Sequence, residues 1–188
     1  DITKSLTENI KNVAAKMNRN VDEITLVMLD RERHHGLMKE ARDLGARIML
    51  ISDGDVNPAM ECCIEGSGVH MVVGTGGAPE GVLAAAALKC VGGDMQARLK
   101  PETDEEIRRC HEMGITDVNQ VLTLDDLVRT DDVIFAATAI TRGNLLNAIQ
   151  YFPGGARTHT IVMRSKTGTV RFLDTVHMDE KLKSLKAK

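Results

Sequence analysis

Residues 69–88 have the sequence VHMVVGTGGAPEGVLAAAAL, and this stretch decides the fold that the chain is predicted to adopt. It begins with an apolar run typical of a strand, continues through a glycine-rich loop, and ends in an alanine-rich run typical of a buried helix. Glycines let a ligand approach the backbone closely, and the first N–H groups of a helix have no partner inside it. The stretch therefore predicts an anion-binding loop between a strand and a helix, with a plain structural turn as the alternative.

The same alternation is found upstream of this stretch. Apolar runs at residues 24–29 and 47–52 predict strands, and the segments at residues 33–44 and 56–64 predict helices. Strands that alternate with helices are typical of a parallel sheet flanked by helices. We therefore predict an α/β fold with a mainly parallel sheet, preceded by a further helix over residues 2–17.

Beyond residue 92 the pattern changes to shorter and more varied segments. Helices are predicted at residues 104–113, 123–128, 145–151 and 179–188. A strand is predicted at residues 133–140, and a hairpin at residues 160–164 and 169–173 around Ser165-Lys166-Thr167-Gly168. The chain, residues 1–188, is thus expected to contain a βαβ region at about 20–92 and a second region at about 93–188.

Composition narrows the range of partners. The chain has 188 residues, of which 43% are hydrophobic and 27% charged, as is usual for a globular protein of one domain or two small ones. Its net charge of −3 argues against a nucleic-acid partner, which would require a basic surface. We expect no membrane association, because the sequence has no apolar run of spanning length and its first residues are too polar for a signal peptide.

The four cysteines, Cys62, Cys63, Cys90 and Cys110, match no zinc-binding spacing. All four lie in segments predicted to be helical, which favours buried free thiols in a reducing compartment and therefore a cytoplasmic protein. The sequence starts at Asp1 without an initiator methionine, and we expect it to be a portion of a longer chain.

Three charged or glycine-rich loops follow the three predicted strands, at residues 30–33, 53–55 and 74–80. The carboxyl ends of parallel strands lie at one edge of a sheet, where ligands bind in folds of this class. We therefore expect the three loops to converge on one site. Such convergence indicates ligand binding more strongly than any one of the loops alone.

Each loop carries side chains suited to a phosphorylated ligand. Arg31 and Arg33 could clamp a phosphate through bidentate hydrogen bonds, although a solvated helix start is the alternative. Asp53 and Asp55 could accept hydrogen bonds from sugar hydroxyls or bind a cation, and Asp55 could also cap the next helix. Glu80 places a carboxylate where a cation or a sugar hydroxyl could meet it, which suggests phosphate chemistry with a metal nearby.

Two adjacent histidines, His34 and His35, follow the arginines. Neighbouring side chains on a helix point in different directions, so we do not expect the pair to chelate a metal. One of the two is expected to pack or to form hydrogen bonds. No Ser-His-Asp or Cys-His arrangement stands out in the sequence, so nothing supports nucleophilic catalysis.

Long stretches of the sequence resemble the class II fructose-1,6-bisphosphatases of bacteria. The resemblance is carried by residues 50–56 (LISDGDV), 76–90 (GGAPEGVLAAAALKC), 158–171 (THTIVMRSKTGTVR) and 134–138 (IFAAT), and by the loop at residues 30–34. It runs through nearly the whole chain and implies the carboxyl-terminal portion of a family member.

The resemblance implies a layered sugar-phosphatase fold shared with the lithium-sensitive phosphatases. It also implies hydrolysis of the 1-phosphate of fructose 1,6-bisphosphate in gluconeogenesis, with Mn²⁺ or Mg²⁺ as cofactor, and we expect a homo-oligomer. The family's substrate-binding positions correspond to Arg31, Glu32, Arg33, Asp53, Gly54, Asp55 and Gly77 of this chain. Glu80 corresponds to a metal-binding glutamate, and Glu32 stands where the family commonly has proline.

The family's other metal ligands and its catalytic threonine are implied to lie upstream of Asp1, in an amino-terminal metal-binding half. Because a hydrolytic metal site needs several acidic ligands, we expect this chain alone to be inactive. Two alternatives remain open at this point. One is a phosphatase of sedoheptulose 1,7-bisphosphate or of an inositol phosphate, and the other is a non-catalytic domain that binds sugar phosphates.

Overall fold

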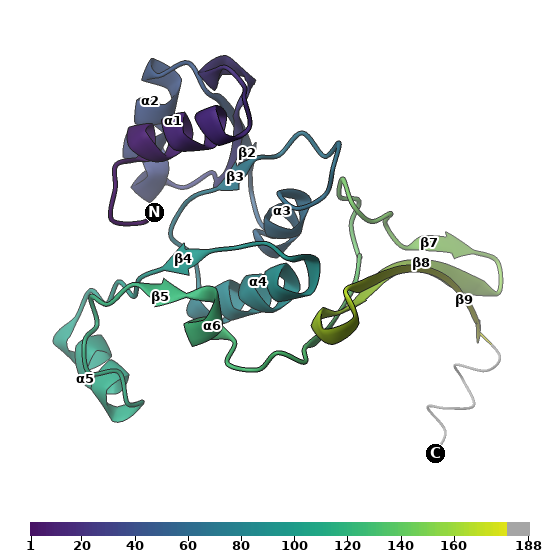
Figure 1. The fold of residues 1–188 in the computed structure, drawn as a ribbon. Helices are drawn as coiled ribbons and strands as arrows, with labels where there is room; N and C mark the ends of the chain where they lie inside the picture. The colour runs from purple at the N-terminus through teal and green to yellow at the C-terminus, as the bar shows by residue number, and fades with distance from the viewer. Residues whose placement is uncertain (180–188) are drawn as a thin grey trace.

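A parallel sheet of three strands forms the centre of the first region (Figure 1). β1 (Thr25–Leu29) is its middle strand, between β2 (Arg47–Ile51) and β3 (Met71–Val72). The structure, a computed structural model, describes residues 1–179. It confirms the predicted α/β fold with a parallel sheet, but the strand expected over residues 69–73 is reduced to the two residues of β3.

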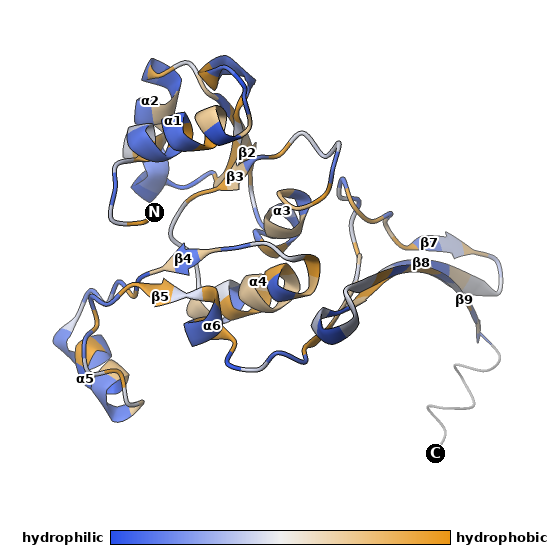
Figure 2. Cartoon of the chain, in the orientation of Figure 1, coloured by the Kyte–Doolittle hydropathy of each residue, from blue (hydrophilic) through white to orange (hydrophobic). Residues whose placement is uncertain are grey.

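Two helices, α1 (Leu6–Lys16) and α2 (His35–Asp43), pack together on the sheet, and Figure 2 shows polar residues over much of their visible side. α1 begins at a capping box, in which Ser5 Oγ accepts from the Glu8 N–H (3.2 Å) and the Glu8 carboxylate accepts from the Ser5 N–H (3.1 Å). The core between helices and sheet contains Leu6, Ile10, Ala14, Ile24, Leu26, Met28, Met38, Ala41 and Ala46.

Helix α4 (Ala78–Val91) links the two halves of the molecule. It packs against α3 (Val56–Glu61) on one side and against the second sheet on another. A helix that is apolar on most sides is expected in the interior, and α4 is drawn mainly in apolar colours in Figure 2. It ends at Gly92, whose φ of +73° is the left-handed conformation usual for the residue after a helix.

The second sheet is antiparallel and has four strands, β6 (Ile134–Thr138), β7 (Gln150–Phe152), β8 (Gly155–Arg164) and β9 (Thr169–Met178). β8 pairs with β6 and β7 along one edge and with β9 along the other. The predicted hairpin is confirmed, and the chain turns through a short 3₁₀ helix (Ser165–Thr167) and Gly168, whose φ is +58°. Two other 3₁₀ helices lie at Val21–Glu23 and Glu32–His34.

One face of β9 is exposed and, apart from Asp174, apolar. The side chains of this β9 stripe alternate along the strand and are each between 43% and 54% exposed: Val170, Phe172, Val176 and Met178. Phe172 pairs with Ile161, and residues opposite each other in an antiparallel pair share a face. Ile161 is fully buried in the cluster that includes α4. The β9 stripe therefore continues a face that is buried against α4 over β8 but is half exposed over β9.

The helix predicted at residues 145–151 is wrong. Its last residues belong to β7, which pairs with the start of β8 across a turn at Pro153 and Gly154. Leu145 and Ile149 have helical spacing, but the hydrogen bonds between β7 and β8 replace those that a helix would make. The tail helix predicted at residues 179–188 lies outside the described residues, apart from Asp179.

A small antiparallel ribbon was not anticipated by the sequence pattern. It consists of β4 (Gln96–Ala97) and β5 (Leu122–Thr123), and α5 (Asp104–Glu112) stands beyond it, away from both sheets (Figure 1). Capping boxes at Thr103 and Thr123 start α5 and α6 (Leu124–Leu127). Because caps have recognisable sequences, both helices begin where they were predicted to begin.

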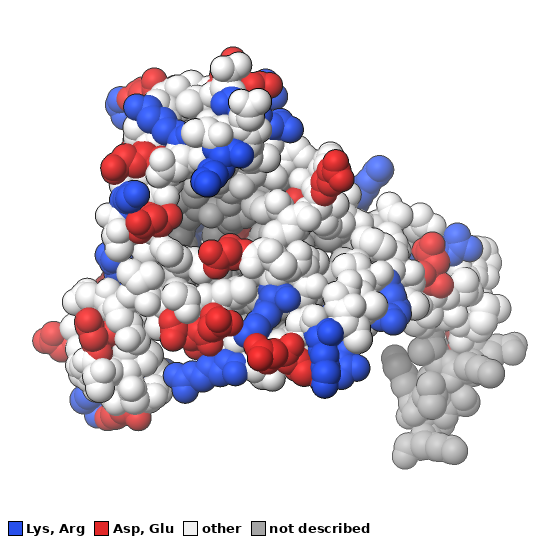
Figure 3. Space-filling view, viewed as in Figure 1, with Lys and Arg blue, Asp and Glu red and all other residues white. Residues whose placement is uncertain are grey.

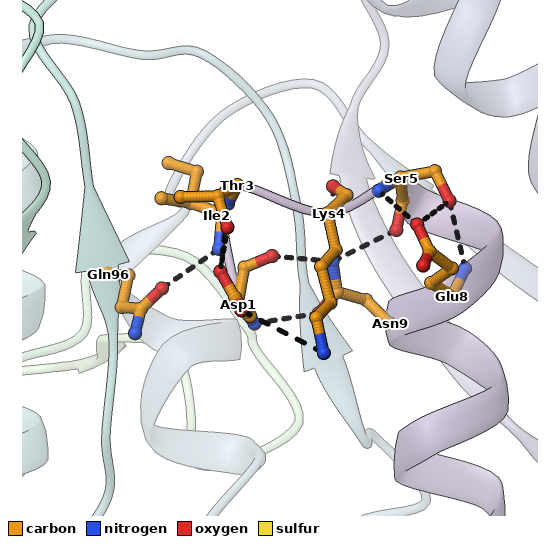
Figure 4. A network of polar contacts seen from close by, with 8 residues as sticks. All are labelled: Asp1, Ile2, Thr3, Lys4, Ser5, Glu8, Asn9 and Gln96. Atoms are coloured by element: carbon orange, nitrogen blue, oxygen red, sulfur yellow. Dashed lines mark hydrogen bonds and ion pairs between the residues drawn. The ribbon is translucent and has the colours of Figure 1, made fainter.

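Polar contacts tie the first residues of the chain to two elements (Figure 4). Asn9 of α1 accepts from the backbone nitrogen of Asp1 through Oδ1 (2.7 Å) and donates to the Asp1 carbonyl oxygen (2.8 Å). The Ile2 N–H donates to Gln96 Oε1 on β4 (2.8 Å). These contacts hold the amino terminus between α1 and the base of the ribbon.

Acidic and basic side chains are interspersed over the face of the molecule shown in Figure 3. This distribution agrees with the small net charge of −3. Among residues 1–179, no helix combines the length and the apolar character needed to cross a bilayer.

Candidate functional site

The loops after β1, β2 and β3 meet at the carboxyl edge of the parallel sheet. Arg31, in the first loop, donates from Nη2 to the Ser52 carbonyl oxygen (2.7 Å) and to Asp53 Oδ1 (3.3 Å). Its Nη1 donates to the Asp30 carbonyl oxygen (2.9 Å). These bonds join the ends of β1 and β2, and they engage part of the guanidinium that was expected to bind phosphate.

Arg33 joins the first loop to the glycine loop. Its Nε and Nη2 both donate to the Thr75 carbonyl oxygen, at 2.9 and 2.7 Å. The residue is exposed, and Nη1 has no hydrogen-bond partner among the described residues. Because a guanidinium has five N–H donors, Arg33 retains donors for a ligand while it holds the loop.

His34 lies buried between the first loop and the glycine loop and is only 1% exposed. Its Nδ1 is 2.8 Å from the Leu29 carbonyl oxygen, and its Nε2 accepts from the Thr75 N–H at 2.8 Å. The prediction that one of the two adjacent histidines forms hydrogen bonds is confirmed, and His35 is exposed.

Helical spacing in the sequence indicates that His34, rather than His35, is the inward-facing histidine. His34 precedes the buried Met38 by four residues and therefore lies on the inward side of α2. Thr75, in contrast, takes part through its backbone N–H and carbonyl groups. No side-chain pattern could have identified it.

The second loop contributes two carboxylates on either side of Gly54, whose φ of +82° is left-handed and favours glycine. Asp53 points outward with 86% of its side chain exposed. Asp55 occupies the N-cap position of α3, but its side chain makes no capping hydrogen bond. Instead its carboxylate lies against the glycine loop, because a Cβ at Gly76 would be 2.9 Å from Asp55 Oδ2.

Gly77 and Glu80 are close together at the start of α4. Gly77 is the N-cap residue, and Glu80 stands exposed in the first turn with its carboxylate folded back toward Gly77. A Cβ added at Gly77 would collide with Glu80 Oε2. The bare backbone at Gly77 thus leaves the space that the carboxylate occupies, and a carboxylate at this end of a helix is favoured by the helix dipole.

The structure therefore brings together most of the predicted site residues. Arg31 contacts Asp53, Arg33 contacts the glycine loop, and Asp55 lies against the same loop. The Glu32 side chain is exposed in the 3₁₀ helix of the first loop and makes no hydrogen bond or ion pair among the described residues. Its side chain is not joined to the other loops.

The donor atoms in the described residues do not by themselves fit a metal ion. No group of three or more His, Cys, Asp or Glu side chains is placed there to hold one. Glu80 would supply a single carboxylate, whereas Mg²⁺ and similar ions are held by several oxygen ligands. A metal site at Glu80 requires further ligands from elsewhere.

The cysteines and the main concavities lie away from the three loops. All four thiols are free; Cys90 and Cys110 are buried and Cys62 is partly buried. Burial, followed by the neighbouring Cys63 and Glu61, raises the pKa of the Cys62 thiol to about 12, so this group is no nucleophile at neutral pH. One concavity, of about 280 Å³, is lined by Glu61, Glu65 and Asn144 among others.

Comparison with known proteins adds to this geometry. The family described as bacterial fructose-1,6-bisphosphatase, glpX-encoded, matches residues 1–177. A protein of Crocosphaera subtropica named D-fructose 1,6-bisphosphatase class 2/sedoheptulose 1,7-bisphosphatase is 43% identical over 200 residues, with 100% of this chain and 58% of that protein covered. Synechococcus elongatus has a protein of the same name that is 43% identical over 197 residues, with 98% and 57% covered.

The chain is thus similar to only part of each relative. It spans 58% of the length of the Crocosphaera protein and 57% of the Synechococcus protein. A third relative, from Acaryochloris marina, is 42% identical over 199 residues, which cover 100% of this chain and 57% of that protein. Its name also includes both fructose 1,6-bisphosphatase and sedoheptulose 1,7-bisphosphatase.

Proposed function

Since the chain belongs to the bacterial, glpX-encoded family of fructose-1,6-bisphosphatases, we propose that it forms the carboxyl-terminal, substrate-binding part of such an enzyme. The complete protein would hydrolyse the 1-phosphate of fructose 1,6-bisphosphate to give fructose 6-phosphate and phosphate, a step of gluconeogenesis. The observation that carries this proposal is the convergence of three strand-end loops, in which Arg31 donates to Asp53 and Arg33 donates to the Thr75 carbonyl oxygen.

Each loop has a proposed task in binding the substrate. Arg33, with its free Nη1, and Arg31 neutralise the phosphate that is not cleaved. Asp53 and Asp55 accept hydrogen bonds from sugar hydroxyls, and Gly54 allows Asp53 to point outward. For Glu32 and Gly77 we propose contacts from the backbone to the substrate. The exposed Glu32 side chain and the bare Cα of Gly77 support that assignment.

For Glu80 we propose a role as one ligand of Mn²⁺ or Mg²⁺. Its exposed carboxylate at the start of α4 supports this role, but the described residues supply no second and third ligand around it. The remaining ligands would come from an amino-terminal metal-binding half, together with the catalytic residue. We therefore propose that the chain alone is inactive.

The β9 stripe supports the proposal that further polypeptide packs on this chain. It is a half-exposed apolar face that continues a buried one, and the relatives contain a further 42% or 43% of their length outside the matched part. In this arrangement residues 1–188 form the carboxyl-terminal part of a layered fold of the lithium-sensitive phosphatase type, with a substrate-binding region at about 20–92 and a second region at about 93–188. Cytoplasmic location and homo-oligomerisation belong to the same proposal.

The test is a phosphate-release assay of the complete protein with Mn²⁺ and a panel of phosphate esters. We expect release from fructose 1,6-bisphosphate and none from this chain alone. Release from sedoheptulose 1,7-bisphosphate would identify a second activity, which the names of the relatives favour. Preference for an inositol phosphate would contradict the assigned substrate. Binding of sugar phosphate without any release would instead indicate a non-catalytic domain.

A further inference from the structure

The ring of His34 connects two loops of the proposed substrate site. It is 1% exposed and lies between the carboxyl end of β1 and the glycine loop. Its Nδ1 lies 2.8 Å from the Leu29 carbonyl oxygen, and its Nε2 lies 2.8 Å from the Thr75 nitrogen. Leu29 is the last residue of β1, whereas Thr75 lies in the middle of the glycine loop.

The two hydrogen-bond partners show which ring nitrogen of His34 carries the hydrogen. A carbonyl oxygen can only accept a hydrogen bond, so Nδ1 must carry a hydrogen to bond to Leu29. A backbone N–H can only donate, so Nε2 must be bare to accept from Thr75. His34 is therefore a neutral imidazole with its hydrogen on Nδ1. In this form each ring nitrogen satisfies one partly buried backbone group.

The glycine loop is built around this ring. A Cβ added at Gly74 would lie 3.0 Å from His34 Cε1 and 3.1 Å from Nε2, and Gly74 has a φ of +156°. Both the conformation and the close approach of the ring therefore favour glycine at this position. His34 thus limits the positions that the loop can adopt from Gly74 onward.

Both backbone polar groups of Thr75 form hydrogen bonds with the first loop. Its N–H donates to His34, and its carbonyl oxygen accepts two hydrogen bonds from Arg33. Arg33 and His34 are adjacent in the chain, so one short segment fixes one residue of the glycine loop. Five residues after Thr75 comes Glu80, at the end of the same loop.

We propose that His34 is a positioning residue, which sets the glycine loop with Gly77 and Glu80 against the arginine loop through its hydrogen bond to the Thr75 N–H, beside the two from Arg33 to the Thr75 carbonyl oxygen. The inference rests on the proposed function, because these loops are assigned there to substrate and metal. It predicts that loss of this bond weakens the binding of both, even where the fold is retained.

Two variants of His34 separate the two hydrogen bonds. His34→Gln can place Oε1 near the position of Nε2 and accept from Thr75, while His34→Asn can place Nδ2 near the position of Nδ1 and donate to Leu29. His34→Phe keeps the ring shape and removes both bonds. His35→Phe is the matched control, because His35 is exposed and its neighbour's contacts are untouched.

The experiment measures, in the full-length protein, the half-saturating concentrations of fructose 1,6-bisphosphate and of Mn²⁺. His34→Asn and His34→Phe should raise both half-saturating concentrations by about tenfold, because each variant leaves the partly buried Thr75 N–H without its hydrogen bond. His34→Gln should stay within about threefold of wild type, and His35→Phe should match wild type. If His34→Asn equals His34→Gln, or if only the melting temperature changes, the proposal is overturned.

A second measurement does not depend on activity. In ¹⁵N NMR spectra of the full-length protein, His34 should show a protonated Nδ1 and a bare Nε2, and the Thr75 amide should exchange faster in His34→Asn than in His34→Gln. A protonated Nε2 or equal exchange would contradict the positioning role. If these spectra agree but no phosphate is released by wild type, the proposed function fails while the loop contact stands.

Discussion

β1 of the parallel sheet and β9 of the antiparallel sheet both contain apolar side chains, but these are covered to very different extents. In β1, Leu26 and Val27 are fully buried, and α1 and α2 pack on the sheet. In β9, the four side chains of the β9 stripe are 43% to 54% exposed within the described part of the chain. Apolar composition therefore predicts that a strand forms, whereas burial depends on whether another element reaches it.

The two regions also differ in what they carry. The strand ends of the parallel sheet hold the three loops of the candidate site, while the antiparallel sheet offers an open apolar face. We interpret the first as the part that binds ligand and the second as the part that binds further polypeptide.

The largest effect is expected from Glu80→Gln in the full-length protein. Loss of a charged ligand should lower metal-dependent turnover on the order of a thousandfold, as removal of key electrostatic groups does in other enzymes. The melting temperature should stay near that of wild type, because Glu80 is exposed. Glu112→Gln, at an exposed position of α5 away from both sheets, is the control and should keep its activity. Wild-type turnover in Glu80→Gln would contradict the proposed role of Glu80 as a metal ligand.

Leu26→Ala in β1 should lower the free energy of unfolding by about 3 kcal/mol, because it leaves a cavity in a closed core. Leu50→Ala in β2, where the side chain is 39% exposed, should cost less than about 1 kcal/mol. Urea denaturation of both variants measures the difference. Equal losses would show that the two positions are equally covered in the complete protein.

Phe172→Ala tests whether the β9 stripe is covered in the complete protein. If further polypeptide packs there, the free energy of unfolding should fall by about 2 kcal/mol, near the lower range for buried side chains truncated to alanine. Tyr151→Ala in β7, where the side chain is 82% exposed, should change it by no more than about 0.5 kcal/mol. A Phe172→Ala effect as small as that of Tyr151→Ala would leave the stripe uncovered.

The smallest effect is expected for the pH dependence of stability, through His70 beside the amino-terminal end of β1. Burial, followed by the charges of Arg19 and Arg47, lowers the pKa of His70 from 6.5. Its Nδ1 accepts from the Thr25 N–H at the start of β1 (2.9 Å), and a proton on Nδ1 would break that bond. The unfolded chain therefore binds the proton more readily than the folded one, and stability should fall as the pH drops below about 6.5.

His70→Asn separates this contribution from other titrations. Its Oδ1 can accept the same hydrogen bond but does not titrate, so thermal melts between pH 7.5 and about 5 should lose part of their pH dependence relative to wild type. An unchanged pH dependence would show that His70 is not its source.

Much of the fold followed from local sequence patterns. The βαβ order and the starts of α5 and α6 depend on periodicity and capping, which neighbouring residues determine. The convergence of the strand-end loops followed from that order, because it is typical of a parallel sheet. The errors arose where distant residues decide the outcome. β7 and the β4–β5 ribbon are short segments whose hydrogen bonds come from partner strands.

The candidate site was predictable to a similar degree. Residue types and strand ends indicated Arg31, Arg33 and Asp53, whose side chains do meet neighbouring loops. The contact of Thr75 with His34 is made by a backbone amide and a buried ring, so residue type alone did not reveal it.

Helix α5 gives the molecule a practical property. It stands beyond the β4–β5 ribbon, whose two short strands pair at the start and the end of the segment that contains α5 (Figure 1). Its amide protons should consequently exchange with solvent without opening of the parallel sheet. The turn at Gly114, after α5, is accordingly a suitable place to attach a fluorophore or to insert an affinity tag.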